Sequence, residues 1–231
     1  MRRYAPDVYG LPGAACFNGT IGNLIINNSL ARYYEDNRQP VAYIDESFET
    51  ESTDTFYVIA VAVVDDDELH VSRSTLKSFY GGQAFHAAPM FANLEKETLR
   101  QATQLVARQN DGLDIIVCAP IEENQSRDNA RRKCLAFAVE KVQRDFGTQL
   151  FVLDSLGTPT ENKLDQYTFS DLRSAGSGRL VRKTTAIHCR PSEEILLGLP
   201  DVLAWSYRQE HVRGDKTWFE PMREFTQVTV L

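Results

Sequence analysis

Hydrophobic residues along this chain fall into short runs that are separated by polar segments. The runs "VAYID" (41–45) and "TFYVIAVAVVD" (55–65) are apolar, β-branched and aromatic, which is typical of buried strands. The acidic segment 46–54 between them predicts a turn, so the two runs should form an antiparallel hairpin. Further strands are expected at 113–120, 148–155, 179–189 and in the tail "FTQVTVL".

Helical patterns occupy the segments between these runs. Residues 93–110 predict an amphipathic helix, and residues 126–147 predict a second with Ser126 as N-cap and Gly147 just past its end. Segment 191–214 predicts a third helix, capped by Ser192, that must kink or restart at Pro200 because proline lacks a backbone donor. Shorter helices are expected in "NSLARYYED" and before Gly81.

This order of elements predicts an α/β fold. Two or three antiparallel strands come first, and strands then alternate with helices. Residues 1–40 are rich in Asn, Gly and Pro and have weak periodicity, so we interpret them as an N-terminal arm. Residues 41–231 should form one domain.

Composition and charge narrow the class of function. The hydrophobic share of 42% suffices for a sizeable core, and the net charge of −7 argues against a simple electrostatic binder of nucleic acid. Two basic clusters, 127–133 and 179–190, could contact phosphates or could be solvated faces. No apolar stretch is long enough to span a membrane, no secretory signal is present, and the four cysteines are scattered, so a cytoplasmic protein is expected.

Acidic residues stand at the ends of two predicted strands. Asp45 ends the first strand, Asp154 ends a later one, and ligands of α/β proteins gather at strand ends. Asp201 lies among Leu, Pro and Val in the last helix, where it could join a site or could complement the dipole of a helix that restarts at Pro200. Three clustered carboxylates repel one another unless a divalent cation joins them, and their hard oxygen ligands suit Mg²⁺ or Mn²⁺.

Other chemistries have little support in the sequence. No HExxH zinc motif, dinucleotide-binding glycine motif or P-loop is present. His86, in the apolar run "AFHAAPMF", is either a packed residue or a proton shuttle beside the acids. His188 is a weaker candidate of the same kind.

Several of these short motifs occur in an order typical of one family. "AYIDES", "FHA", "FVLDS" and "LPDVLAW" together resemble the bacterial and phage family called domain of unknown function 3800, over roughly residues 41–210. The resemblance implies a ribonuclease H-like mixed sheet, with antiparallel first strands, parallel later strands and helices on both faces. This chain departs from the family at Pro200, where Ala is usual, and at Gly198, where Gln is common.

The resemblance also implies a site. It assigns Asp45, Asp154 and Asp201 as metal ligands, with Glu46 as a less certain member. Because Glu46 follows Asp45 directly, its side chain faces the other side of a regular strand.

The sequence thus leads to three functional hypotheses. The main one is a nuclease that uses Mg²⁺ or Mn²⁺ at these acids, with His86 assisting proton transfer. Phosphate contacts would come from Arg182, Lys183, Arg131 and Arg132. The alternatives are a non-catalytic binding or assembly protein on the same fold, and a metal phosphoesterase acting on a small nucleotide.

Overall fold

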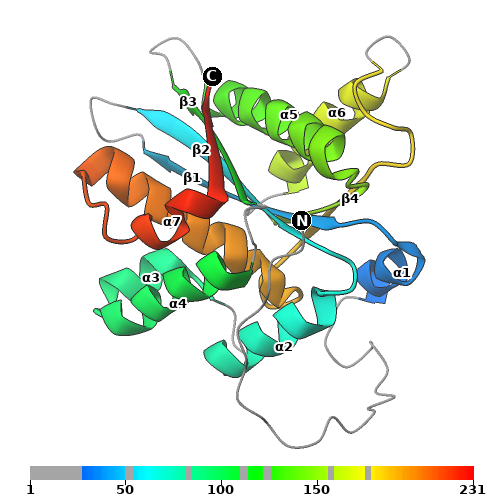
Figure 1. Ribbon diagram of the computed structural model, residues 1–231. Coiled ribbons are helices and arrows are strands. Elements are labelled where there is room, and N and C mark those ends of the chain that lie inside the picture. Colours follow the sequence, from blue (N-terminus) through cyan, green and yellow to red (C-terminus); the bar gives the residue numbers. More distant parts are fainter. Residues whose placement is uncertain are drawn as a thin grey trace, which may run out of the picture.

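The computed structural model describes residues 28–49, 55–81, 85–109, 114–121, 126–155, 159–174 and 178–231 (Figure 1). Most of the predicted arm, the part of the predicted turn after Glu49, and the predicted helix stop at 110–112 lie outside these residues. The helices and strands are α1 (Asn28–Asp36), β1 (Val41–Glu49), β2 (Phe56–Val64), α2 (Leu69–Tyr80), α3 (Ala87–Ala92), α4 (Lys96–Gln109), β3 (Asp114–Pro120), α5 (Arg127–Phe146), β4 (Leu150–Asp154), α6 (Pro159–Arg173), β5 (Thr185–Cys189), η2 (Ile195–Leu197), α7 (Gly198–Arg213), η3 (Glu220–Phe225) and β6 (Thr226–Val230).

The described strands form one mixed sheet in the order β5-β4-β1-β2-β3-β6. β1 pairs antiparallel with β2, and β2 pairs antiparallel with β3. The remaining pairs, β1 with β4, β4 with β5 and β3 with β6, are parallel. This arrangement confirms the predicted α/β class and the predicted change from antiparallel to parallel pairing.

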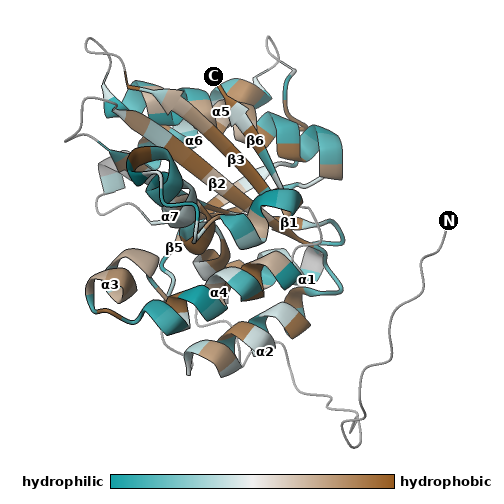
Figure 2. Cartoon of the chain, turned by 60° about the vertical axis from the view of Figure 1, so that its left-hand side comes forward, coloured by the Kyte–Doolittle hydropathy of each residue, from teal (hydrophilic) through white to brown (hydrophobic). Residues whose placement is uncertain are grey.

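Helices cover both faces of the sheet (Figure 1). α5 packs on β2 and β3 from one side, and α6 lies beside α5. α7 packs on β1 and β2 from the other side, together with α2, α3 and α4. Because both faces are covered, all of β2 is buried, and it appears as a continuous apolar band in Figure 2.

Side chains of β1 alternate between the two cores. Ala42 and Ile44 join the core under α5, whereas Val41 and Tyr43 join the core under α7. By this alternation Asp45 belongs to the α7 side and Glu46 to the α5 side.

Several predicted boundaries are wrong, each for a local reason. β1 continues to Glu49 instead of turning after Asp45, because residues 46–49 pair with β2. The strand predicted at 179–189 is confined to Thr185–Cys189. The helix predicted from Ser192 begins at Gly198, after a 3₁₀ turn in which Glu194, not Ser192, accepts a hydrogen bond from the Leu196 amide.

Two helices had no prediction at all. α3 is a six-residue helix, too short for a periodic pattern. α6 was missed because its buried face carries Asp165 and Thr168 beside Phe169 and Leu172, which interrupts the apolar stripe. The prediction for α5 is confirmed, with Ser126 accepting from the Asn129 amide and Gly147 at φ 71°.

A buried ion pair anchors the segment that leads into α7. Arg73 of α2 donates two hydrogen bonds to Glu194 Oε2 and Oε1, and Arg73 Nη2 lies 2.7 Å from Oε2. The hydroxyl of Tyr34 also donates to Glu194 at 2.7 Å, and it lies 2.9 Å from that of Tyr43. This cluster links α1, α2 and β1 to the turn before α7, and so fixes where α7 begins.

The described cysteines form no disulfide bonds. Cys118, Cys134 and Cys189 are free thiols and buried, and burial raises the pKa of each. Within the described segments, none of the helices has both the length and the apolar character needed to cross a bilayer.

Candidate metal centre

Two of the predicted acids meet at one edge of the sheet. β1 and β4 are parallel neighbours, and their register pairs Ile44 with Leu153. Asp45 and Asp154 are the next residues of the two strands, so they stand at the same level at the carboxyl ends. This confirms that neighbouring parallel strands bring both acids to one edge.

The third acid comes from α7, which packs on β1. Asp201 lies in the first turn of this helix and forms a side-chain hydrogen bond with Asp45. Two carboxyl groups form such a bond only when one of them carries a proton. The predicted convergence of Asp45 and Asp201 is therefore present in the fold, across the interface between α7 and the sheet.

The pKa values of the three acids reflect their proximity. Burial raises the pKa of Asp45 well above its usual range, and the charges of Asp201, Glu46 and Asp154 raise it further. Burial raises the pKa of Asp201 to about 7, to which the charge of Asp154 adds. The pKa of Asp154 rises to about 6, through burial and the charge of Glu46.

Backbone amides hold these carboxylates in place, that of Ser155 acting on Asp154. The Glu46 amide donates to Asp45 Oδ1 at 2.7 Å, and the Ala87 amide donates to Asp201 Oδ2 at 2.7 Å. Both bonds favour the charged form and partly offset the rise in pKa. The "FHA" segment thus contributes to the site through the backbone of Ala87.

The two departures from the family pattern are compatible with this geometry. Pro200 is the third residue of α7, where a backbone donor has no partner within the helix, so the missing N–H costs little. Asp201 follows in the same turn, so it also complements the helix dipole, and this position is compatible with either interpretation of Asp201. A Cβ atom at Gly198 would lie 3.4 Å from Phe85 Cβ, so this position favours a small residue.

Glu46 faces away from Asp45, as strand alternation predicts. Its Oε2 lies 2.8 Å from Arg131 Nη1. Arg131 also donates from Nε and Nη2 to the two carboxylate oxygens of Asp165, and from Nη1 to the Tyr57 hydroxyl. We call Glu46, Tyr57, Arg131, Asp165 and His188, whose Nε2 lies 2.9 Å from Asp165 Oδ2, the charged network behind the site.

This network includes one of the predicted nucleic-acid contacts, Arg131. Arg131 is only 5% exposed and is fully engaged with Glu46, Asp165 and Tyr57. A contact between Arg131 and phosphate stays a prediction, but its guanidinium is already bound by acids that a lone position on a helix does not reveal.

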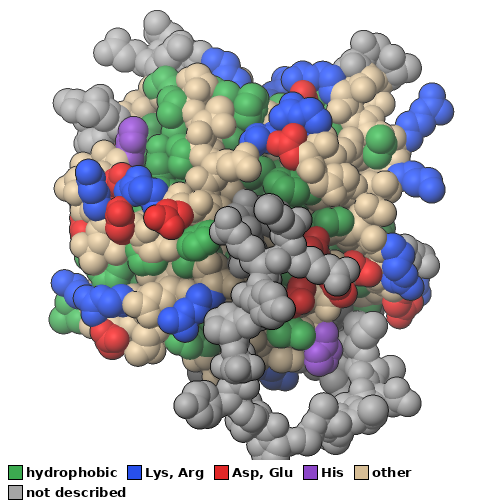
Figure 3. All heavy atoms as spheres, viewed as in Figure 1, with side chains coloured by type: hydrophobic (Ala, Val, Ile, Leu, Met, Phe, Trp, Pro, Cys, Tyr) green, Lys and Arg blue, Asp and Glu red, His purple; other side chains and the backbone are tan. Residues whose placement is uncertain are grey.

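The other predicted phosphate contacts lie away from the acids. Arg182 and Lys183 are exposed and precede β5, and β5 begins level with Leu150, at the opposite end of β4 from Asp154. Neither reaches a phosphate bound at the acids, and contact with a more distant part of a nucleic acid stays a prediction. On the face seen in Figure 3, described Lys and Arg side chains are scattered among acidic and apolar ones.

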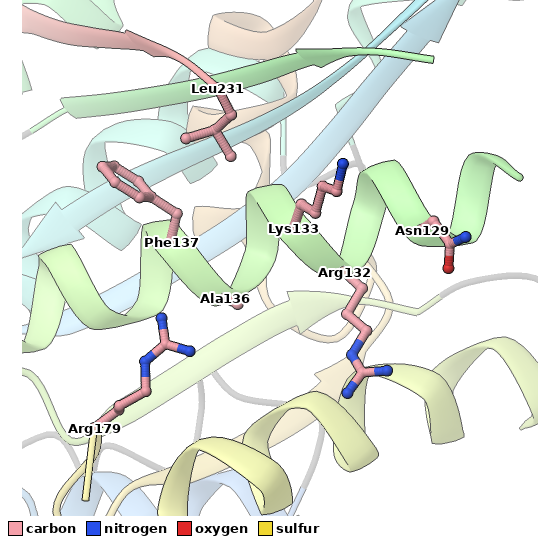
Figure 4. Close-up of a pocket in the computed structure, with 7 residues that line it drawn as sticks. All are labelled: Asn129, Arg132, Lys133, Ala136, Phe137, Arg179 and Leu231. Carbon is pink, nitrogen blue, oxygen red and sulfur yellow. The ribbon is translucent and has the colours of Figure 1, made fainter. Parts of the chain in front are cut away.

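Arg132 lines a different hollow, on the outer side of α5 (Figure 4). This cavity of about 470 Å³ lies between α5 and the C-terminal residue, and Lys133, Phe137, Arg179 and Leu231 also line it. Arg132 pairs with Asp171 at 2.6 Å, and Arg179 pairs with Glu140. α5 covers the face of the sheet opposite α7, so this basic hollow is separate from the three acids.

His86 is exposed and stands at the N-terminus of α3, next to the amide that binds Asp201. It lines a cavity of about 320 Å³ together with Tyr80 and Phe85. Sequence reasoning missed Tyr80, although its position one residue before the helix-ending Gly81 places it beside the "FHA" segment.

The donor set fits a hard divalent cation. Within the described residues, Asp45, Asp154 and Asp201 have no Lys or Arg within ion-pair distance, and the charges of Arg131 and His188 offset only part of the rise in the pKa of Asp154. In the same residues, no cluster of three or more His, Cys, Asp or Glu side chains is already arranged as a metal-binding group.

None of the family models, curated proteins or solved structures compared with the chain matches it. The resemblance to the domain of unknown function 3800 family therefore rests on the short motifs and stays an interpretation.

Proposed function

We propose that this protein is a phosphodiesterase that uses Mg²⁺ or Mn²⁺ to hydrolyse nucleic acid. The observation that supports the proposal is the meeting of Asp45, Asp154 and Asp201 at one sheet edge without a cationic partner among the described residues. Burying an isolated carboxylate lowers the stability of the fold by several kcal/mol. Such destabilising groups are typical of sites where a bound ligand compensates the charge. Membership of the ribonuclease H-like superfamily is part of the same proposal.

The roles of the residues follow from their positions. Asp45, on the central strand, holds the metal from the sheet, while Asp154 and Asp201 hold it from the neighbouring strand and from α7. A bound divalent cation supplies activated water and stabilises the leaving oxygen. The Ala87 amide keeps one oxygen of Asp201 fixed, and the Glu46 amide does the same for Asp45. His86, exposed beside them, is placed to pass a proton to solvent.

Glu46 has a supporting role in this proposal. It faces Arg131 on the other side of the strand, and its charge raises the pKa of both Asp45 and Asp154. The buried free thiols of the described cysteines are consistent with a reducing, cytoplasmic location, which we also propose.

A non-catalytic binding protein is the second candidate. The observation in its favour is that the three carboxylates of the described chain are not yet arranged as a metal-binding group. On this view the acids would stay protonated in the working protein, and the fold would serve assembly alone.

The deciding experiment compares the wild type with Asp45→Asn. The matched control is Asp67→Asn, which makes the same change at an exposed acid outside the site. Titration calorimetry with Mn²⁺ and hydrolysis of labelled single- and double-stranded DNA and RNA are measured for all three proteins.

We expect Mn²⁺ binding and metal-dependent cleavage by the wild type and by Asp67→Asn. Asp45→Asn should lose more than the roughly 100-fold that loss of a residue supporting a metal ligand costs. Absence of Mn²⁺ binding by the wild type would leave the non-catalytic candidate, and full activity of Asp45→Asn would reject this site.

A further inference from the structure

The cavity beside Asp201 has an aromatic wall. Phe79 and Tyr80 come from the end of α2, Phe85 and His86 from the segment before α3, Met90 from α3 and Asn93 from the turn after it. The rings of Tyr80 and Phe85 stack with centroids 4.2 Å apart and planes 28° apart, and Phe79 packs edge-on against Tyr80 at 4.7 Å. We call this cavity the aromatic pocket.

The aromatic pocket adjoins the candidate metal centre. A Cβ atom at Gly198, in the same helical turn as Asp201, would lie 3.4 Å from Phe85 Cβ and 3.7 Å from Tyr80 Cε2. The residue after His86 donates its amide to Asp201. The charge of Asp201 also contributes to the raised pKa of Tyr80, whose main cause is burial. A molecule in the pocket would therefore be a neighbour of any group bound at the acids.

The lining favours a flat, uncharged ring over a phosphate. Among the described residues that line the pocket, none is Lys or Arg, and Glu95 adds a negative charge. Aromatic and thioether side chains offer stacking surface, and Asn93 and Thr98 offer polar groups to the edge of a ring. Its volume of about 320 Å³ is at the small end of ligand sites, which suits a single ring system.

We propose that the aromatic pocket binds the base of the nucleotide next to the phosphate at the acids. This inference rests on the proposed function and adds a substrate class to it: single-stranded or unpaired nucleic acid. A base paired within a duplex is not free to enter a side pocket without leaving its stack. Stacking on aromatic side chains is tolerant of sequence, so the pocket should select for the presence of a base more than for its identity.

The test measures binding without cleavage. Fluorescence anisotropy gives the Kd of short single-stranded oligonucleotides with Ca²⁺ in place of Mg²⁺ or Mn²⁺, for an intact strand and for strands with one abasic residue at each position. We expect one position at which removal of the base weakens wild-type binding by about 5- to 100-fold, the range measured for loss of a stacked base. A duplex of the same sequence and a free nucleoside monophosphate should both bind more weakly than the intact strand.

The variants separate the pocket from general effects. Phe79→Ala and His86→Ala should each reduce the difference between intact and abasic strands. Tyr80→Phe should keep the difference in Kd between intact and abasic strands, because it retains the ring. The hydroxyl that it removes is buried without a partner among the described residues. Tyr167→Ala, at an exposed aromatic residue of α6, is the matched control and should behave as the wild type. Circular dichroism of each variant confirms folding, and Phe79→Leu replaces Phe79→Ala if that variant does not fold.

Each outcome bears on one proposal at a time. Equal binding of intact and abasic strands at every position, or an unchanged difference in Phe79→Ala and His86→Ala, would overturn the pocket even if abasic strands are still hydrolysed. Equal binding of the duplex would overturn the single-strand preference. Tight binding of the free monophosphate would assign the pocket to a small nucleotide instead. Base-dependent binding without any Mn²⁺-dependent hydrolysis would support the pocket and reject the proposed chemistry.

Discussion

Asp45 lies where its negative charge destabilises the folded state. It is 9% exposed, and three neighbouring acids raise its pKa in addition to burial. One backbone amide is its only hydrogen-bond donor from the main chain of the described residues, so the fold does not neutralise it. Residues that lower stability in this way are typical of functional sites.

Because the charged forms of these buried acids destabilise the folded state, the stability of the protein should depend on pH. The folded-state pKa values of Asp154, about 6, and Asp201, about 7, lie above the ordinary value of 3.8. Between about pH 4 and 7 the folded state therefore holds more protons than the unfolded state, so lowering the pH through this window stabilises the fold. Without metal, the melting temperature should rise from pH 8 to pH 5 by at least the 2–4 °C that about 1 kcal/mol produces in a chain of this size.

Asp201→Asn is the variant for this measurement. The side-chain oxygen of the new Asn can still accept the hydrogen bond from the backbone amide of Ala87. It should melt higher than the wild type at pH 8 and show a smaller rise on acidification. Asp67→Asn should follow the wild-type curve. A wild-type melting temperature that falls steadily from pH 8 to pH 5 would contradict the repulsion at the site.

At the residue scale the sequence predicts the acids but not their surroundings. Asp45 and Asp154 are recognisable because each ends a strongly apolar strand. Arg131 is not recognisable, since its partner Asp165 lies 34 residues away on a helix that has no clear apolar stripe. The hydrogen bond from the Ala87 amide cannot be predicted from the sequence for another reason. Every residue except proline has a backbone donor, so the residue type does not indicate which donor binds a carboxylate.

At the scale of elements, the charged network behind the site joins elements that also share the hydrophobic core under α5. Arg131 connects α5 to Glu46 of β1 and to Asp165 of α6, and Asp165 in turn contacts His188 of β5. These groups are nearly fully buried, so each depends on its partners for compensation. The network lies directly behind the strand that carries Asp45.

Arg131→Met should therefore be strongly destabilising. It removes the cation that pairs with both Glu46 and Asp165 and leaves His188 as the remaining partner of Asp165, so a loss of about 3–5 kcal/mol is expected. Urea unfolding followed by circular dichroism measures this loss. Arg132→Met changes the next residue, whose side chain is 63% exposed, and should stay within about 0.5 kcal/mol of the wild type. Equal stabilities of the two variants would mean that the network contributes little.

Sequence periodicity predicts most of the elements and fails where polar groups are buried. The apolar runs give all the strands, and the capping residues Ser126 and Gly147 give the bounds of α5. The predicted turn directly after Asp45 is wrong, because residues 46–49 pair with β2 and the charge of Glu46 is compensated by Arg131. α6 was missed for the same reason, a charged residue on its buried face.

At the scale of the whole molecule, the site exists only through the topology. β1 lies near the middle of the sheet, β4 is its parallel neighbour, and α7 crosses over β1 (Figure 1). The change from antiparallel to parallel pairing at β1 brings the ends of β1 and β4 together. Pairing order of this kind is a global property, which local patterns restrict but do not determine.

A metal bound at the acids should stabilise the whole fold. A ligand that binds only the folded state adds about 2.7 kcal/mol at 100 times its Kd, which corresponds to roughly 5–10 °C in melting temperature for a chain of this size. We expect Mn²⁺ to raise the wild-type melting temperature by this order and to leave Asp45→Asn unchanged. The rise should be larger at pH 8 than at pH 6, because Asp201 and Asp154, with pKa values raised to about 7 and about 6, must lose their protons before they bind a metal.

Scanning fluorimetry with added Mn²⁺, reversed by EDTA, measures this effect. An equal rise for the wild type and Asp45→Asn would place metal binding elsewhere on the molecule.

The amide that holds Asp201 comes from Ala87, 114 residues earlier in the chain. Asp201 itself belongs to α7, which follows every strand of the sheet except β6. During synthesis, a nascent chain whose α7 is still inside the ribosome exit tunnel has only two of the three acids. Under the proposed function, the chain therefore cannot hydrolyse nucleic acid until α7 has left the tunnel and packed on β1.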